Sequence, residues 1–314
     1  MDAVLGVEYT AGHTPEALQQ YNPQRWSIKF AREVCRQFLQ GLNALHSQKI
    51  SHRDLHPENM ILTLSYSLND LSMTQIQADM WDADSDLDDA SENWNSQNLK
   101  ETDKWIAQVK RLDGQPLQPT EIQYVVEPFP LHDKVIINQQ DFRIVITDLG
   151  FVKRFDDQDL RKTGIQNYRA PEAILPLNET PPQADIFSAG LVIWEIVMNR
   201  NMIWSHFYED KTTKQRISDN DQYLKDLEGR IGPMPPAFQK LWTYRDDMEG
   251  GELEEDDFAY GDMNFAAHRD RPDDMSDAEV KIFVRFMQAV LQWEPERRPS
   301  AANLLQHEWL QTVW

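Results

Sequence analysis

The segment SHRDLHPEN, residues 51–59, gathers four side chains that could do chemistry, namely His52, Asp54, His56 and Asn59. Two histidines four positions apart could bind one zinc ion from the same face of a helix. Pro57, directly after the second histidine, favours a loop instead, and Arg53 stands where a zinc-peptidase helix needs a glutamate. These residues argue against a zinc site, and the role of the segment has to be judged from the elements and motifs around it.

The segment before this loop predicts a long helix. Its apolar residues recur at steps of three and four, which is the spacing of one buried helical face. They are Ile28, Ala31, Val34, Phe38, Leu42 and Leu45. Pro23 suits the first turn of such a helix. Cys35, the single cysteine of the chain, falls within this pattern, cannot form an internal disulfide and is expected to be a buried thiol.

Two short apolar runs of strand length, residues 59–64 and 143–150, follow the helix. The residues between these runs are polar and acidic, with a short helix expected around residues 101–112. We interpret residues 66–141 as an insert between two strands that pair as a hairpin. From Ala184 onward the spacing of apolar residues is helical. The helices expected there lie at residues 184–198, 220–231, 277–293 and 300–310.

Charge and hydropathy narrow the classes of function. The formal net charge is −21, which argues against direct binding to nucleic acid or to an anionic membrane and favours a basic partner. Two acidic runs, residues 79–92 and 246–257, are interpreted as solvated loops, with a docking surface for a basic peptide as the alternative. The longest apolar run, residues 187–198, contains Glu195 and is too short to cross a bilayer, so we expect an intracellular protein.

Five motifs occur in the order and spacing found in eukaryotic protein kinases, and the chain resembles that family. They are HRDLHPEN at 52–59, DLG at 148–150, YRAPE at 168–172, ADIFSAG at 184–190 and EPERRPSAANLLQHEWL at 294–310. The resemblance implies a mainly α (α+β) fold, similar to the large C-terminal lobe of a kinase, with a short β-hairpin and an acidic insert.

Finer details resemble the SR protein kinases, which phosphorylate Arg-Ser-rich splicing factors. Leu149 replaces the usual Phe, the insert separates two strands, and the activation segment is short. The resemblance implies a hinge-like segment at residues 1–20 and a C-lobe at residues 21–314 that the insert 66–141 interrupts. The glycine-rich loop and strand lysine of the family's small lobe have no counterpart, which implies that the chain begins at the hinge.

Carried over residue by residue, the resemblance implies that Asp54 is the catalytic base that orients the attacking hydroxyl. It also implies that Asn59 and Asp148 bind Mg2+ on the phosphates of ATP. Structural roles are implied for His52, Arg53, Gly150, Glu172, Asp185 and Arg298. Among these, Asp185 is expected to hold the loop backbone, and Glu172 is expected to form a buried ion pair with Arg298.

Two positions depart from the family's pattern. His56, which joins Asp54 among the catalytic candidates, stands where kinases usually carry a lysine that contacts the transferred phosphate. Ile165 stands where the family has a threonine that bonds to the catalytic aspartate and to that lysine. A neutral imidazole neutralises less developing charge than an ammonium, so the two changes together favour weak or absent catalysis.

The resemblance implies a protein serine/threonine kinase that transfers the γ-phosphate of ATP to basic or Arg/Ser-rich proteins, impaired here by the missing small lobe. A non-catalytic, pseudokinase-like module that binds basic partners is the first alternative. The second is a small-molecule kinase of the aminoglycoside phosphotransferase type, whose loop is often written H-G-D-L-H-P-x-N and carries a histidine at the position of His56. The oligomeric state is left open.

Overall fold

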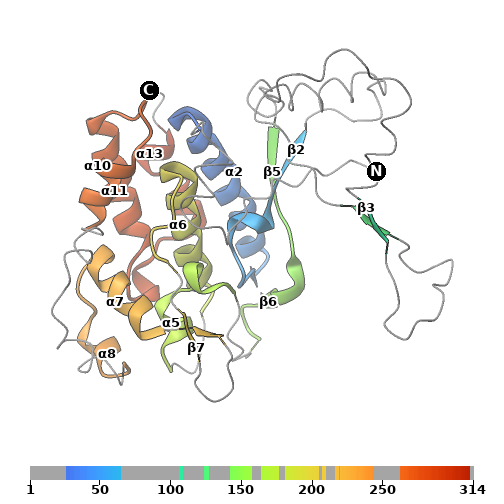
Figure 1. The fold of residues 1–314 in the computed structure, drawn as a ribbon. Helices are drawn as coiled ribbons and strands as arrows, with labels where there is room; N and C mark the ends of the chain where they lie inside the picture. Colours follow the sequence, from blue (N-terminus) through green and yellow to red (C-terminus); the bar gives the residue numbers. More distant parts are fainter. Residues whose placement is uncertain are drawn as a thin grey trace, which may run out of the picture. The chain divides into compact units, whose positions relative to one another are not determined.

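The computed structural model describes residues 26–64, 106–108, 124–126, 142–157, 164–176, 181–204, 207–209, 216–218, 220–242 and 262–311. The chain divides into two compact units, one of Met1–Val7 with Leu64–Phe142 and one of Glu8–Thr63 with Arg143–Trp314. Every described helix lies in the second unit, as Figure 1 shows. Most of the expected insert at 66–141 and all of the hinge-like segment at 1–20 lie outside the described residues.

Helix α2, Ile28–Ser47, is the long helix that the sequence predicts. Ser27 caps it by accepting a hydrogen bond from the backbone N–H of Phe30 at 3.3 Å. The predicted apolar face is buried as far as Leu42, and Leu45 is half-buried. Cys35 is buried as expected, and burial raises the pKa of its thiol. Pro23 lies outside the described residues.

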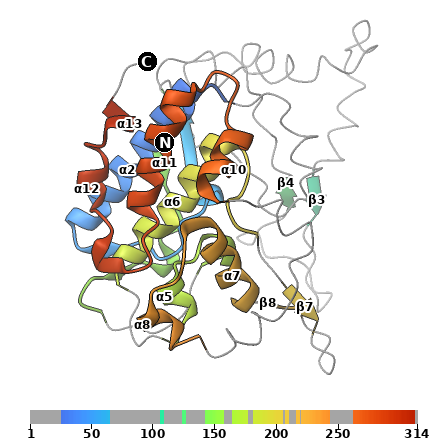
Figure 2. The same ribbon diagram turned by 90° about the vertical axis from the view of Figure 1, so that its left-hand side faces the viewer.

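The N-terminal half of α2 is held by residues from the C-terminal part of the chain. The backbone N–H of Ile28 donates to Asp274 at 3.0 Å, and Arg32 forms a buried ion pair with Glu279. Along its length α2 also packs against α12, Ala301–Leu304, and α13, Glu308–Gln311. Figure 2 shows both of these late helices beside α2.

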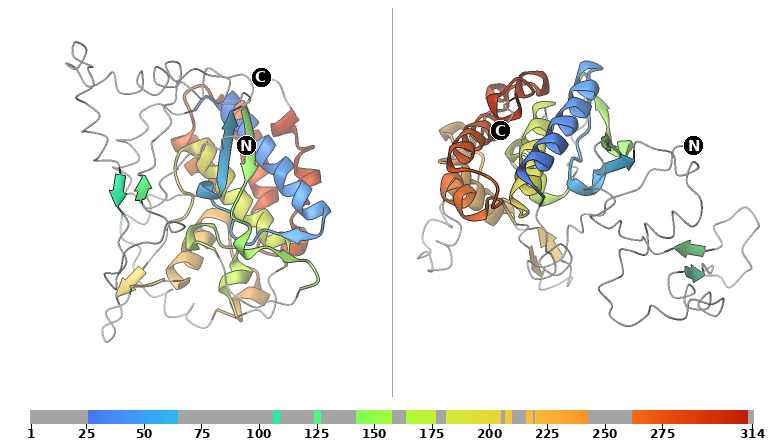
Figure 3. Two further views of the ribbon diagram at one scale, coloured as in Figure 1. Left: turned by 90° about the vertical axis from the view of Figure 1, so that its right-hand side faces the viewer. Right: turned by 90° about the horizontal axis from the view of Figure 1, so that it is seen from above.

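Two small sheets bracket the loop that contains residues 52–59. Strand β1, Ile50–Ser51, pairs antiparallel with β6, Lys153–Arg154, and β2, Met60–Leu64, pairs with β5, Phe142–Ile146. Figure 3 shows β2 and β5 side by side. The predicted hairpin of these two strands is therefore confirmed.

The prediction of a short helix around residues 101–112 is wrong. This stretch contains β3, Ile106–Gln108, which pairs antiparallel with β4, Tyr124–Val126. Pairing with a segment that is rich in aromatic and β-branched residues outweighs the weak helical spacing of the stretch. A further hairpin that the sequence did not indicate consists of β7, Phe207–Glu209, and β8, Arg216–Ser218.

The predicted helical second half is confirmed. Its elements are α5 (Pro171–Ile174), α6 (Gln183–Met198), α7 (Asn220–Ile231), α8 (Pro236–Gln239), α10 (Met263–Asp270), α11 (Asp277–Val290), α12 and α13. Short 3-10 turns occur at Pro57–Asn59, Leu149–Phe151, Gln166–Tyr168 and Pro295–Arg297. No described helix has a stretch long and apolar enough to cross a membrane.

Helix α6 is the centre of the second unit. It is buried almost all round and packs against both α2 and α11. Gly190 permits the close approach to α11, because a Cβ added there would lie 2.6 Å from Cγ1 of Val290. A helix buried on every side can carry polar side chains only where they find partners, and α6 carries Asp185 and Glu195.

Candidate active site

Asp185, near the start of α6, holds the backbone of the loop that carries Asp54. Its two carboxylate oxygens accept hydrogen bonds from the backbone N–H groups of His52 at 2.7 Å and Arg53 at 2.8 Å. Arg53 has a φ of 72°, a left-handed conformation that costs energy in a residue other than glycine. The Nε2 atom of His52 lies 2.8 Å from the carbonyl oxygen of Thr147, next to Asp148. These contacts fix the turn just before Asp54.

Asp54 is 9% exposed as a residue, and its buried Oδ1 has no hydrogen-bond partner among the described residues. Gly164 covers one side of it, because a Cβ at that glycine would lie 3.3 Å from Oδ1. The side-chain N–H of Asn59 donates to the main-chain carbonyl of Asp54 at 2.8 Å, so the amide oxygen of Asn59 is the end that can bind a cation. An unpartnered buried carboxylate oxygen is costly unless a ligand or substrate uses it.

The His56 imidazole lies between two carboxylates without bonding to either. Its Nε2 is 3.8 Å from Oδ1 of Asp54, and its Nδ1 is 3.8 Å from Oε2 of Glu58. The ring stacks on Tyr168 with 6.2 Å between centroids, and no hydrogen bond from Nδ1 occurs within the described part of the chain. Burial lowers the pKa of His56, although both carboxylates oppose that shift, so the ring is mainly neutral at neutral pH.

Asp148 lies in an exposed segment of the chain. Its φ is 54°, and its side chain accepts a hydrogen bond from the backbone N–H of Gly150 at 3.2 Å. The neighbouring Thr147 donates its backbone N–H to the carbonyl of Asn59 at 2.9 Å, which ties the segments of Asn59 and Asp148 together. Leu149 is 53% exposed.

The donor set suits magnesium better than a transition metal. One carboxylate from Asp148 and one amide oxygen from Asn59 are hard oxygen ligands, and Mg2+ is commonly held by one or two such groups together with phosphate oxygens. No cluster of three or more His, Cys, Asp or Glu side chains that could hold a metal occurs in the described segments. The residues therefore fit a Mg2+ ion that also binds the phosphate oxygens of a nucleotide.

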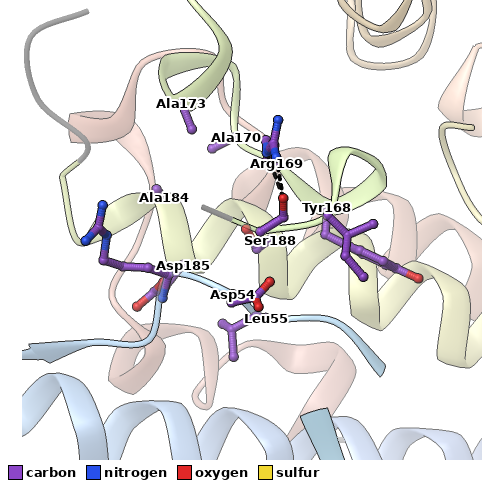
Figure 4. A pocket seen from close by; sticks show the side chains of 12 residues that line it. Asp54, Leu55, Tyr168, Arg169, Ala170, Ala173, Ala184, Asp185 and Ser188 are labelled. Carbon is purple, nitrogen blue, oxygen red and sulfur yellow. Dashed lines mark hydrogen bonds between the residues drawn. The ribbon is translucent and has the colours of Figure 1, made fainter. Parts of the chain in front are cut away.

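A pocket opens beside Asp54, and Figure 4 shows the side chains that line it. Its lining comes from the loop around Asp54, from residues 164–173 and from the first turns of α6, and includes Ile165, Tyr168 and Ser188. Arg169 donates from Nε to the carbonyl of Gly164 at 2.9 Å and so fixes the loop that covers Asp54. Ile165 is 38% exposed and offers no hydroxyl to the catalytic candidates.

A buried polar cluster that includes Tyr168, a residue of the pocket lining, was not predicted from the sequence. The Tyr168 hydroxyl donates to Glu195 at 2.5 Å, and the Asn201 amide donates to the same carboxylate at 3.1 Å. Burial raises the pKa of Glu195 to about 7, and the hydrogen bond from Tyr168 opposes this shift. A signal was present, because a glutamate within an apolar run that becomes a buried helix needs a polar partner. Its partners could not be named from the sequence.

Glu172 and Arg298 form a bidentate ion pair below the pocket. The two N–O distances are 2.5 and 2.8 Å, and both side chains are almost completely buried. Arg298 also donates to the carbonyl oxygens of Gln292 and Trp293, and its guanidinium lies 4.8 Å from the ring centroid of Phe187. The pair links α5 to the segment before α12 and does not touch Asp54.

Comparison with known proteins identifies the family. The sequence model of the protein kinase domain matches residues 132–310, which is more than half of the chain. A serine/threonine protein kinase of Aspergillus fumigatus is 26% identical over 150 residues, covering 46% of this chain and 34% of that protein. Dual specificity protein kinase CLK4 of Mus musculus is 22% identical over 286 residues, covering 90% and 45%, respectively.

SRSF protein kinase 3 of Homo sapiens is 26% identical over 184 residues, covering 55% of this chain and 30% of that protein. The chain thus spans less than half the length of these curated relatives. A chain in the crystal structure of the yeast RNA Pol II CTD kinase CTDK-1 complex superposes with a TM-score of 0.54 at 13% identity, over 99% of this chain and 69% of that one, which supports the fold. This protein belongs to the protein kinase family, with a resemblance to the SR protein kinases, as its motifs predict.

Proposed function

We propose that this chain is the large lobe of a protein serine/threonine kinase that transfers the γ-phosphoryl group of ATP to hydroxyl side chains of basic proteins. The observation that carries the proposal is the buried Oδ1 of Asp54, which has no hydrogen-bond partner among the described residues and lies at the wall of a pocket. A substrate hydroxyl that donates to Asp54 would be oriented for attack on the γ-phosphorus. It would lose its proton to the carboxylate as the new phosphoester bond forms, while the bond from the γ-phosphorus to the β–γ bridging oxygen breaks and ADP leaves.

ATP supplies the phosphoryl group, and Asn59 and Asp148 would hold the Mg2+ that accompanies it. The hydrogen bond from Asn59 to the carbonyl of Asp54 supports a fixed relation between metal ligand and base. Arg169 holds Gly164 against Asp54, which supports a pocket of defined shape for the incoming side chain. The chain's contribution is therefore mostly positioning, which is what phosphoryl transfer requires.

The negative net charge of the chain supports the proposal that its substrates are basic. The chain has a net charge of −21, and the Glu58 side chain, 37% exposed, lies next to His56 near the catalytic loop. Carboxylates around a reaction site attract Arg-rich peptides and raise their rate of association. The similarity to SRSF protein kinase 3 is consistent with Arg/Ser-rich substrates.

The turnover of this chain is expected to be slow. Because burial keeps His56 mainly neutral, no ammonium-like charge faces the transferred phosphate from that position. Ile165, which lines the pocket with Asp54, cannot donate a hydrogen bond. The double variant His56→Lys/Ile165→Thr should raise the rate above that of the unaltered chain.

The test is incorporation of the γ-phosphate of ATP into an Arg/Ser-rich peptide by the full chain with Mg2+. Asp54→Asn should reduce the rate at least about 100-fold, because a general base typically contributes that much. Asp156→Asn is the matched control, since its carboxylate is 78% exposed and bonds only to Arg154 in the described structure. Equal rates for Asp54→Asn and the unaltered chain would contradict the proposed role of Asp54.

A second candidate is a non-catalytic module that binds basic partners, and the neutral His56 beside an aliphatic Ile165 favours it. It predicts binding to an Arg-rich peptide that weakens steeply with salt and does not depend on ATP. Peptide binding together with no phosphate transfer, even by the double variant, would select this candidate. The small-molecule kinase is not pursued, because the matching family is that of protein kinases.

A further inference from the structure

Tyr223, in the first turn of α7, lies against the segment that contains Tyr168 and Arg169. Its side chain is buried, and its hydroxyl donates to the carbonyl oxygen of Arg169 at 2.9 Å. The carbonyl oxygen of Asn167 lies 3.4 Å from the same hydroxyl. Burial raises the pKa of the Tyr223 hydroxyl, so the group keeps its proton and remains a donor. Helix α7 therefore presents one donor to two backbone carbonyls of this segment.

A second hydrogen bond joins the same two parts of the chain. The buried side chain of Gln166 donates from Nε2 to Oδ1 of Asn220, the first residue of α7, at 3.0 Å. Gln166 begins the 3-10 turn that ends at Tyr168, and Arg169 follows that turn directly. The start of α7 thus bonds to both ends of the turn that contains Tyr168.

Other contacts hold α7 in its place. Its apolar residues Leu224 and Leu227 are buried. Trp242 donates from Nε1 to the carboxylate of Asp221 at 2.7 Å. The position of the helix is therefore set by its own packing, and the turn at residues 166–168 can use α7 as a support.

Arg169 connects this turn to the pocket beside Asp54. Its guanidinium donates from Nε to the carbonyl oxygen of Gly164 at 2.9 Å. Gly164 has a φ of 86°, which glycine adopts without strain, and a Cβ added there would lie 3.3 Å from Oδ1 of Asp54. All three residues line the pocket, and Figure 4 shows Arg169 and Asp54 in it. The wall that covers Asp54 is therefore linked to α7 through Arg169.

The hydroxyl is the part of Tyr223 that this link requires. A phenylalanine would fill the same space, whereas a buried hydroxyl is unfavourable unless it forms a hydrogen bond. Here the bond goes to the backbone of Arg169, whose side chain holds Gly164. A change in the position of the Arg169 backbone would move its guanidinium and release the carbonyl of Gly164.

We propose that Tyr223 is a positioning residue for this wall of the pocket, acting on Gly164 through Arg169. It contacts neither the substrate nor the reacting atoms. Because Asp185 holds the backbone before Asp54 independently, loss of the Tyr223 hydroxyl should loosen the wall and leave the base in place. The consequence for peptide binding rests on the proposed function, whereas the support of the turn does not.

Two substitutions in the full chain separate this contact from the general stability of α7. Tyr223→Phe removes the hydroxyl and keeps the ring, so the packing of the helix is retained. Trp242→Phe is the matched control, because it removes a hydrogen bond to Asp221 in the same turn of α7. Circular dichroism checks that both variants are folded.

Hydrogen–deuterium exchange detected by NMR measures the support of the turn. The backbone N–H groups of Tyr168 and Arg169 donate to the carbonyls of Ile165 and Gln166, each at 3.1 Å, and report on the turn itself. The backbone N–H groups of His52 and Arg53, which donate to Asp185, serve as reference amides for the loop before Asp54.

In Tyr223→Phe, exchange at the Tyr168 and Arg169 amides should accelerate about tenfold, the effect of removing one donor from a buried carbonyl. The two reference amides should exchange as in the unaltered chain. Trp242→Phe should leave all four amides unchanged. Unchanged exchange at Tyr168 and Arg169 in Tyr223→Phe, or an equal acceleration in Trp242→Phe, would overturn the proposal.

If the unaltered chain transfers phosphate, Tyr223→Phe should raise the KM for the peptide with little change in kcat, since the wall and not the base is displaced. A lower kcat at an unchanged KM would contradict the claim that Tyr223 acts on the wall. An inactive unaltered chain would count against the proposed function alone, because the exchange measurements need no activity.

Discussion

The two carboxylates proposed for phosphoryl transfer lie in segments of opposite character. Asp54 follows a turn whose backbone is held by the buried Asp185, and its own carboxylate is largely covered. Asp148 begins an exposed segment in which Leu149 and Phe151 also face outward. The fold therefore fixes the part of the site that would orient a hydroxyl, while the part that would hold the metal depends more on what binds there.

The largest loss of stability is expected from the buried ion pair between Glu172 and Arg298. Arg298→Met should lower the free energy of unfolding by about 3–5 kcal/mol, because it leaves the Glu172 carboxylate buried and unpaired. Arg285→Met is the control, since Arg285 and Glu308 form an exposed pair and its loss should cost about 1 kcal/mol or less. Both free energies of unfolding are measured by urea denaturation. Similar losses for Arg298→Met and Arg285→Met would contradict this prediction.

A pH effect of similar size is expected from the buried cluster under the pocket. Burial raises the pKa of Glu195 to about 7 in the folded protein, so the native state holds a proton that the unfolded chain releases near pH 4.5. Stability from this group is therefore greatest below pH 4.5 and falls by about 3 kcal/mol as the pH rises to 7, after which it is constant.

The measurement is the difference in unfolding free energy between the unaltered chain and Glu195→Gln across this range of pH. Glutamine can still accept from Tyr168 and does not titrate, so the difference isolates Glu195. A difference that does not change between pH 4.5 and 7 would show that the pKa of Glu195 is not raised in the folded protein.

A smaller loss is expected where α6, which carries Asp185, approaches α11. Gly190→Ala would put a Cβ 2.6 Å from Val290 and 2.8 Å from Leu291, so the helices must separate at a cost of about 1–3 kcal/mol. Gly229→Ala in α7 is the control, because a Cβ there meets nothing within 4 Å and should stabilise by about 0.4–1 kcal/mol. The two changes should shift the thermal midpoint in opposite directions, and a shift in the same direction would refute the packing argument.

The smallest change in the free energy of unfolding is expected in the exposed segment that begins at Asp148. Leu149→Ser removes a side chain that is already half in water and should change the free energy of unfolding by no more than about 0.5 kcal/mol. Leu39→Ala, in the fully buried face of α2, should cost about 2–5 kcal/mol in the same denaturation experiment. A large loss of unfolding free energy for Leu149→Ser would mean that apolar side chains hold the Asp148 segment in place.

Periodicity predicted the helices well, because each buried face repeats along the chain. The face of α2 and the segment that became α6 could be read from apolar spacing, and the hairpin of β2 and β5 from two short apolar runs. The motif residues of the candidate site could be named for the same kind of reason, since they occur in a fixed order. Their catalytic roles stay predictions.

Contacts between distant polar residues could not be predicted. Nothing in the sequence says that His46 faces Asp185, or that Asn201 bonds to Glu195, because these pairs depend on the three-dimensional approach of separate helices and loops. The positive φ of Arg53 could not be predicted either, since arginine rarely adopts it without tertiary support. The error at residues 101–112 has the same cause, because β3 depends on its distant partner β4.

The packing of α2 depends on segments that are synthesised long after the helix itself. This helix emerges early from the ribosome, whereas Asp274, Glu279 and the helices α12 and α13 that cover it emerge late. Until they do, α6 can cover only part of the apolar face of α2, and contacts between such distant segments form slowly. The native packing of α2 is therefore complete only after the residues of α13 have been synthesised.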